Sequence, residues 1–144
     1  ERRNLFRENE EIIINKVNCC LDENIIPILC IGESLEQKRK NLTKEILIKQ
    51  IKSIPKKANK SNMIIAYEPI WAIGSGLTPT LDEINEIHGF IKDNIFQSQE
   101  FKILYGGSVK SLNCKNILSQ KNVDGVLVGG ASIDISEFNK IIKS

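Results

Sequence analysis

One glutamate in this sequence occupies a position suited to proton transfer. The apolar run 63–67 ends at Glu68, and a stiff Pro-Ile-Trp segment (69–71) then leads to a glycine-rich tip that ends at Gly76. An apolar setting desolvates a carboxylate and raises its basicity, and a flexible tip after a hinge is typical of a closing lid. We interpret Glu68 as a general base in an enzyme that excludes water. The spacing alone also fits a surface or ion-paired glutamate at a strand end.

Glycines follow three of the expected strands, and their backbone could hold an anion. They are Gly74, Gly76, Gly106, Gly107, Gly129 and Gly130. Backbone N–H groups approach an anion closely where no side chain intervenes. Gly130 also precedes an expected helix start, where the helix dipole favours negative charge. Turns use glycine in any case, but three such groups together favour a phosphate site. No GxGxxG or P-loop pattern is present, which disfavours nucleotide binding.

Composition places the chain among ordinary globular proteins. It has 144 residues, 41% of them hydrophobic and 26% charged, enough for one domain with a core. A net charge of +2, without a basic stripe that carries aromatics, argues against a nucleic-acid partner. The four cysteines form no CxxC pair, so we expect free thiols in a reducing compartment, the cytoplasm, and no metal site. No secretion signal or apolar run of about 18 residues is seen, so we expect no membrane span.

Helical and strand patterns alternate along the chain. Apolar runs predict buried strands at residues 25–31, 63–67, 102–105 and 125–128. Periodicity and capping signatures predict helices at residues 8–22, 34–53, 80–95, 111–119 and 134–142. This alternation predicts an α/β fold with a parallel sheet, outer helices and a site at the carboxyl ends of the strands. We see no domain boundary within residues 1–144.

Two other side chains fit structural roles. His88 is the only histidine, and it lies inside the helix expected at 80–95. A position in mid-helix points away from the strand ends, so we interpret His88 as a structural residue at the edge of the helix stripe. Trp71 more often packs than recognises a ligand, and here we expect it to anchor the hinge of the lid.

Several segments resemble the triosephosphate isomerase family. They are AYEPIWAIGSG (66–76), LYGGSV (104–109) and DGVLVGGASI (124–133), with PILCIGE (27–33) before them and ERR (1–3) at the start. The resemblance implies a (β/α)8 barrel, of which residues 1–144 form a partial domain: the C-terminal half, with four parallel strands and outer helices. Such a barrel has roughly 250 residues. The chain starts with Glu1 rather than Met, so we expect it to be part of a longer one.

The resemblance implies an activity and its residues. The family interconverts dihydroxyacetone phosphate and glyceraldehyde 3-phosphate in glycolysis and gluconeogenesis, without a cofactor, by proton transfer through an enediolate. Glu68 matches the base, and Glu1 matches a glutamate that follows the catalytic histidine and supports the electrophilic lysine. The phosphate-binding positions match Gly74, Ser108, Gly129 and Gly130. The lid matches Pro69, Ile70, Trp71, Ala72, Ile73, Gly74, Ser75, Gly76, Leu77 and Thr78.

The resemblance also implies contacts around the lid and the base. Tyr105 and Ser108 match residues that fasten the closed lid, and Cys30 matches a buried cysteine beside the base. In the family the tyrosine hydroxyl bonds a backbone N–H at the position of Pro79, but proline has no N–H. We therefore expect this latch to be absent or replaced, and the closed lid to be weaker.

The catalytic histidine and the Asn-x-Lys of the family are absent from these residues. We expect a homodimeric isomerase when the chain is extended by the missing half, with a triose phosphate as its small-molecule substrate. Expressed alone, residues 1–144 should be inactive. They should also aggregate, or pair face to face into a pseudo-barrel, because exposed strand edges and inner faces promote association. The alternative is a non-catalytic half barrel that binds phosphate or self-associates. A different barrel enzyme with a phosphate cradle is a more remote option, since this fold hosts many reactions.

Overall fold

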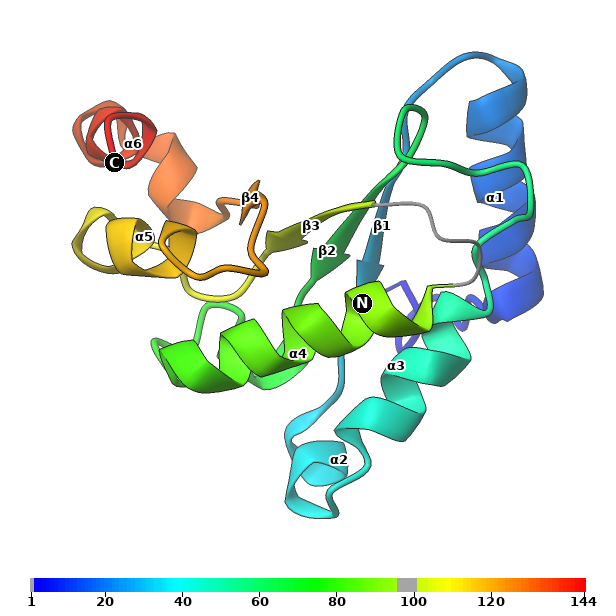
Figure 1. The fold of residues 1–144 in the computed structure, drawn as a ribbon, viewed down its shortest axis with the longest axis horizontal. Helices are drawn as coiled ribbons and strands as arrows, with labels where there is room; N and C mark the ends of the chain where they lie inside the picture. The colour runs from blue at the N-terminus through cyan, green and yellow to red at the C-terminus, as the bar shows by residue number, and fades with distance from the viewer. Residues whose placement is uncertain (1, 96–100) are drawn as a thin grey trace.

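The computed structural model describes residues 2–95 and 101–144, and its strands and helices alternate along the chain (Figure 1). The strands are β1 (Ile28–Ile31), β2 (Ile64–Tyr67), β3 (Lys102–Tyr105) and β4 (Gly125–Val126). The α-helices are α1 (Glu10–Asp22), α2 (Leu35–Arg39), α3 (Thr43–Ile51), α4 (Leu81–Asn94), α5 (Ser111–Leu118) and α6 (Ile135–Ile142). Two short 3₁₀ turns are η1 (Ile70–Ala72) and η2 (Gly130–Ile133).

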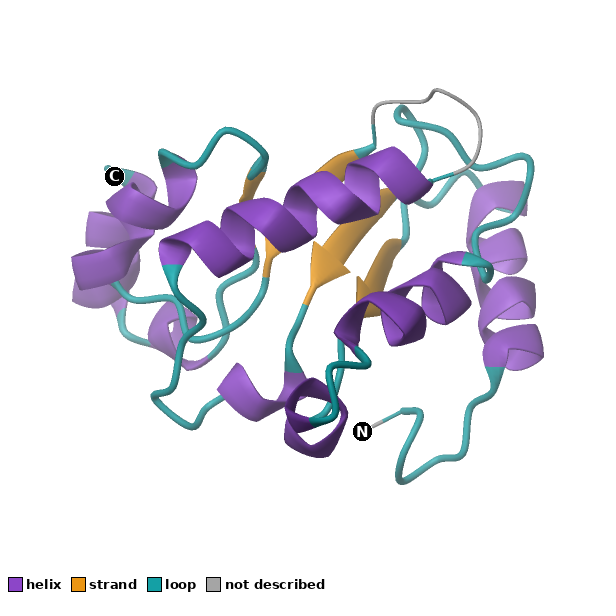
Figure 2. Cartoon of the chain, turned by 60° about the horizontal axis from the view of Figure 1, so that its bottom comes forward, coloured by secondary structure: helices purple, strands orange, loops and turns teal. Residues whose placement is uncertain are grey.

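The four strands form one parallel sheet in the order β1-β2-β3-β4. Cys30 lies opposite Ala66, which in turn lies opposite Leu104. Figure 2 shows the sheet behind α3 and α4, with α1 at the β1 side and α5 and α6 at the β4 side. The fold class predicted from the sequence is confirmed: four parallel strands with helices outside them. Because all four strands point the same way, their carboxyl ends meet at one edge.

Alternate residues of the strands face the helices and form the core. Ile31, Tyr67 and Tyr105 on this outer face are each at most 2% exposed. Between the helices and the sheet lies a core that includes Leu47, Ile51, Ile65, Ile84, Ile91, Ile103 and Ile117. The hydrophobic effect over this layer therefore fixes one face of the sheet.

The first strand differs from its prediction. It was predicted over residues 25–31 and buried on both faces, but β1 begins at Ile28, and that side chain is 44% exposed. Ile25 and Ile26 precede the strand and are 58% and 55% exposed. Leu29 and Ile31 are buried, while Ile28 and Cys30, which alternate with them, are exposed. The physical reason is that only the outer face of the strand is covered by helices in the described part of the chain.

The helix predicted over 34–53 is two helices, α2 and α3, because Asn41 between them has a φ of +56°. Asparagine tolerates this left-handed conformation, which ends a helix. The capping box that starts α2 is confirmed, with Gln37 N to Ser34 Oγ at 3.3 Å and Ser34 N to Gln37 Oε1 at 2.8 Å. The equivalent box of Thr80 and Glu83 starts α4.

Two elements at the C-terminal end also depart from the sequence prediction. The strand predicted over 125–128 is paired only at Gly125–Val126, although Leu127 N still donates to Tyr105 O at 2.8 Å. Asp134 caps α6 as predicted, by accepting from Glu137 N at 2.9 Å. The Glu137 carboxylate does not complete the box, because it accepts from Ser111 N (2.7 Å) and Ser111 Oγ (3.0 Å). Because Ser111 is the first residue of α5, the Glu137 carboxylate connects α6 to the start of α5.

Among the residues that the structure describes, no helix has the length and apolar character needed to cross a membrane.

Candidate functional site

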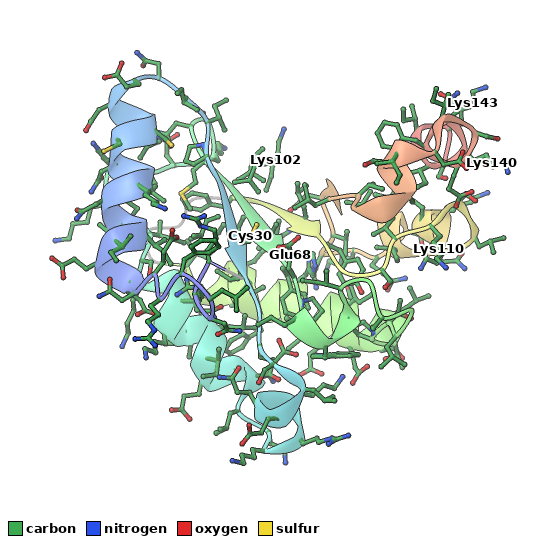
Figure 3. The ribbon with its side chains drawn as sticks, turned by 180° about the vertical axis from the view of Figure 1, so that it is seen from behind. Cys30, Glu68, Lys102, Lys110, Lys140 and Lys143 are labelled. Atoms are coloured by element: carbon green, nitrogen blue, oxygen red, sulfur yellow. The ribbon has the colours of Figure 1, made fainter. Side chains whose placement is uncertain are left out.

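Glu68 directly follows β2, at the edge where the carboxyl ends of the strands meet. Its backbone N–H donates to Ile31 O at 2.7 Å, so the end of β1 fixes its main chain. Its side chain is half-buried and lies against Gly106 after β3: a Cβ built on Gly106 would be 2.5 Å from Glu68 Cγ and 2.8 Å from Oε1. Figure 3 shows Glu68 beside Cys30 on the sheet. The carboxylate therefore lies among the ends of three strands.

The Cys30 thiol is a chemically active neighbour of this carboxylate. Burial raises the pKa of the Cys30 thiol to about 12, and the charge of Glu68 and a hydrogen bond with it add to the rise. The thiol therefore stays protonated and donates to the carboxylate. The prediction that Cys30 is buried is wrong for the described residues, because its side chain is exposed on the uncovered face of the sheet. Protein still surrounds it on its other sides, and we attribute the pKa shift to that partial burial.

The segment expected to form the hinge of a lid is held by a carboxylate that the sequence reasoning did not single out. Glu33 is 1% exposed, and it accepts from Trp71 Nε1 at 2.8 Å and from Tyr67 Oη at 3.2 Å. Its backbone oxygen also accepts from Ile70 N at 3.0 Å. Lys38 Nζ lies 4.0 Å from the centre of the Trp71 ring, a cation–π contact. The signal that could have found Glu33 is a carboxylate directly after a strand-ending glycine.

Beyond this segment, residues 73–78, which we expect to form the lid, are exposed to solvent. Gly74 and Gly76 have φ of +62° and +77°, a region that glycine adopts without strain, and a Cβ on either would meet nothing within 4 Å. Ser75 Oγ donates to Trp71 O at 2.8 Å and accepts from Leu77 N at 3.1 Å, which organises the tip locally. Ala72 in η1 is fully buried, so the transition from anchored hinge to exposed tip falls directly after it.

Of the two residues expected to fasten the lid, Ser108 contacts it and Tyr105 does not. Ser108 Oγ donates to Ala72 O at 2.6 Å and so joins the loop after β3 to the lid. The Tyr105 hydroxyl is buried and has no hydrogen-bond partner among the described residues, so it bonds no lid N–H. Its ring packs in the outer layer, with centroids 6.5 Å from Tyr67 and 6.3 Å from His88, and burial raises the pKa of Tyr105. Pro79, at the expected latch position, is itself buried.

The glycine pair that follows β4 lies at the surface. Gly129 and Gly130 are exposed, and a Cβ on either would meet nothing within 4 Å. The prediction that a helix starts directly after Gly130 is wrong. Gly130 starts the four-residue turn η2, and α6 begins only at Ile135. A single turn has little dipole, so the free N–H groups rather than a helix dipole would attract an anion here.

His88 is fully buried rather than at the edge of the helix stripe. Its ring lies between Tyr67 (5.9 Å) and Tyr105 (6.3 Å) in the outer layer, away from the carboxylate of Glu68. Burial lowers the pKa of His88 to about 4, with a smaller contribution from the positive charge of Lys92. The ring is therefore neutral at pH 7.

One predicted site residue and the question of a metal site remain to be placed. Glu1, expected to support an electrophilic lysine, lies outside the described residues. Within the described ranges, no cluster of three or more His, Cys, Asp or Glu side chains could hold a metal ion. The candidate site thus comprises one carboxylate, a protonated thiol, glycines after three strands, and an exposed glycine-rich loop next to an anchored segment. Such an arrangement can move a proton beside a bound anion.

Comparison with known proteins connects this geometry to a family. The sequence model of triosephosphate isomerase matches residues 1–144. The chain is 43% identical over 150 residues to triosephosphate isomerase of Francisella tularensis subsp. novicida (strain U112), covering 99% of this chain and 59% of the relative. It is 45% identical over 142 residues to that of Mesomycoplasma hyopneumoniae (strain 7448), covering 99% and 58%.

A solved structure gives the same relation in three dimensions. The crystal structure of triosephosphate isomerase from Bartonella henselae superposes with a TM-score of 0.89 at 33% sequence identity, over 99% of this chain and 59% of that one. The chain therefore spans somewhat more than half the length of the relatives it matches.

Proposed function

The chain belongs to the triosephosphate isomerase family, and we propose that residues 1–144 form one partial domain, the C-terminal half of a working isomerase. The reaction interconverts dihydroxyacetone phosphate and glyceraldehyde 3-phosphate. The observation that carries the proposal is the place of Glu68, whose side chain lies against Gly106 and beside Cys30 at the strand ends. A base at this edge, next to a hinged lid, is what an enediolate reaction needs.

In this mechanism the Glu68 carboxylate takes a proton from one carbon of the substrate and returns it to the neighbouring carbon. The electrons of the broken C–H bond form the C=C bond of the enediolate while the carbonyl oxygen on the neighbouring carbon takes up the negative charge. The hydroxyl proton then passes from the oxygen on the first carbon to the oxygen on the second. The C=C electrons take the proton back at the neighbouring carbon, and a carbonyl forms at the first carbon. Exposed N–H groups of the glycine turns at Gly74, Gly129 and Gly130, together with Ser108, hold the phosphate. The family resemblance assigns polarisation of the substrate oxygen to a lysine and a histidine of the preceding half, with Glu1 in support.

The test uses the chain extended at its N-terminus by the segment that its relatives carry. Glu68→Gln keeps the size of the side chain but removes the base, so kcat should fall by about 10²–10⁴-fold, the usual contribution of a general base. The matched control is Glu86→Gln, since Glu86 is exposed on α4 and pairs only with Lys44 among the described residues. Glu68→Gln with the kcat of the control would refute the proposed base.

A second candidate, a self-associating half barrel, is favoured by one observation. On the uncovered face of the sheet, Ile28 is 44% exposed and Cys30 is exposed, while β1 and β4 are its edge strands. Unpaired strand edges and exposed apolar faces promote association. We expect residues 1–144, expressed by themselves, to be inactive and to elute as dimers or larger species. A stable monomer with isomerase activity in size-exclusion chromatography would contradict this.

The wider role follows from the same proposal. The extended chain would act in glycolysis and gluconeogenesis in the cytoplasm, as a homodimer, with a triose phosphate as its substrate and no cofactor. Sedimentation of the extended chain tests the dimer, and isothermal titration with a triose phosphate tests the ligand.

A further inference from the structure

A buried amide side chain in the helix layer is bonded to the end of β1. Gln50 belongs to α3 and is 7% exposed. Its Oε1 accepts from Gly32 N at 2.8 Å, and its Nε2 donates to Gly32 O at 3.1 Å. One carboxamide thus satisfies both backbone polar groups of a single residue. A neighbouring strand would offer the same donor and acceptor to an edge strand such as β1.

Gly32 is the point where β1 touches the main chain of the base. A Cβ built on Gly32 would lie 1.9 Å from Glu68 O and 2.5 Å from Glu68 C, so the two backbones are in direct contact. The preceding residue, Ile31, accepts the Glu68 N–H at 2.7 Å. The following residue, Glu33, holds the indole of Trp71. A displacement of Gly32 would therefore reach both the base and the lid hinge.

We propose that Gln50 is a positioning residue for the isomerase reaction: it holds Gly32 so that Glu68 and the Trp71 hinge keep their places. This rests on the proposed function, because only the assignment of Glu68 as the base gives its position a catalytic meaning. Without the carboxamide, the buried N–H and C=O of Gly32 would lose their partners, and the strand end would move toward other partners or water.

The test compares two variants of Gln50 with a control on the same segment, all in the N-terminally extended chain. Gln50→Met keeps the length of the side chain and removes both hydrogen bonds. Ser53→Ala is the control, because Ser53 is fully buried near the end of α3 and its hydroxyl has no partner among the described residues. We expect kcat of Gln50→Met to fall by about 10–100-fold, as for a displaced reacting group. KM should stay within about twofold, because Gln50 does not line the glycine turns.

A second variant separates positioning from simple loss of packing. In Gln50→Glu the ionised carboxylate accepts from Gly32 N but cannot donate to Gly32 O, whereas the protonated carboxyl does both. Burial raises the pKa of such a carboxyl. The ratio of its kcat to that of the unaltered chain should therefore rise as pH falls from about 8 to about 5. A role limited to packing would leave this ratio flat.

Hydrogen exchange at the Glu68 amide provides a readout that does not need turnover. We expect this amide to exchange at least about tenfold faster in Gln50→Met than in Ser53→Ala, because its acceptor strand is no longer held.

If the unaltered extended chain shows no isomerase activity, the proposed function fails, and the exchange measurement still decides the positioning claim. If Gln50→Met does not fold, Gln50→Glu carries both measurements. Exchange and kcat equal to those of Ser53→Ala would overturn the inference.

Discussion

A methyl group added at Gly106 should disable the base while leaving the fold intact. The Cβ of Gly106→Ala would lie 2.5 Å from Glu68 Cγ, 2.8 Å from Oε1 and 3.1 Å from Cδ. Ordinary contacts start at 3.4 Å, so Cγ has to move by about 0.9 Å. All three contacting atoms belong to the side chain of Glu68, which is half-buried and can rotate. The strain therefore moves the carboxylate rather than the sheet.

A displacement of about 1 Å at a reacting group costs roughly 10²-fold in rate, equivalent to about 2.7 kcal/mol of transition-state stabilisation. We expect kcat of Gly106→Ala in the extended chain to fall by about this factor. The free energy of unfolding should change by about 1 kcal/mol or less, at the low end of the cost of overpacking, because a flexible side chain yields.

Steady-state kinetics and urea unfolding of the same preparation test both halves of this prediction. Gly125→Ala is the matched control, since its Cβ meets only the end of a flexible side chain, Leu104 Cδ2 at 2.9 Å, and not the base. The control should keep kcat within about threefold. If Gly106→Ala retained the kcat of the control, the reasoning that the position of Glu68 determines the rate would be refuted.

Three further predictions concern the outer layer. Tyr105→Phe in the extended chain should leave kcat unchanged, since the Tyr105 hydroxyl has no partner among the described residues, and a kcat loss of tenfold would reveal a latch formed on closure. Gly107→Ala should lower the free energy of unfolding by about 1–3 kcal/mol in urea titrations, because its Cβ would lie 2.1 Å from the buried Tyr105 Oη; an unchanged midpoint would contradict this. His88 has a pKa lowered from 6.5 to about 4, so the unfolded state binds its proton first. The contribution of neutral His88 to the free energy of unfolding should be fully present above pH 6.5 and fall by about 3 kcal/mol toward pH 4. His88→Leu should therefore make the free energy of unfolding less dependent on pH in this range, as measured by thermal melts.

The sequence predicted those features that depend on neighbouring residues. The strand over 102–105 has the bounds that its apolar run indicated, and the boxes at Ser34 and Thr80 start α2 and α4, because each signal lies within a few residues. The break at Asn41 escaped prediction, since asparagine favours the left-handed conformation only when the surrounding chain turns there. The motif around Glu68 predicted its place directly after a strand for the same reason, because that place depends only on the strand and its end.

The supports of the site could not be read from the sequence because their partners are distant along the chain. Gln50 bonds Gly32, 18 positions away, and Glu33 bonds Trp71, 38 positions away. A glutamine within a helix and a glutamate after a strand both look like surface residues until the fold buries them. Likewise, Glu137 resembled the second half of a capping box, but packing of α6 on α5 gave it Ser111 instead. Tertiary competition for a polar group decides such cases.

The two faces of the sheet carry different kinds of groups: one is buried under helices, and the other carries the candidate reactive side chains. Side chains on the outer face, such as Tyr67 and Tyr105, are at most 2% exposed and are fixed by helices that belong to residues 1–144. The groups on the uncovered side, Cys30 and the Glu68 carboxylate, are exposed or half-buried. The outer layer thus sets where Glu68, the proposed base, stands, while a low dielectric that would strengthen it as a base would require protein over the other face. This division is consistent with our two proposals together: Glu68 stands in position to act as the base, and residues 1–144 by themselves show no turnover.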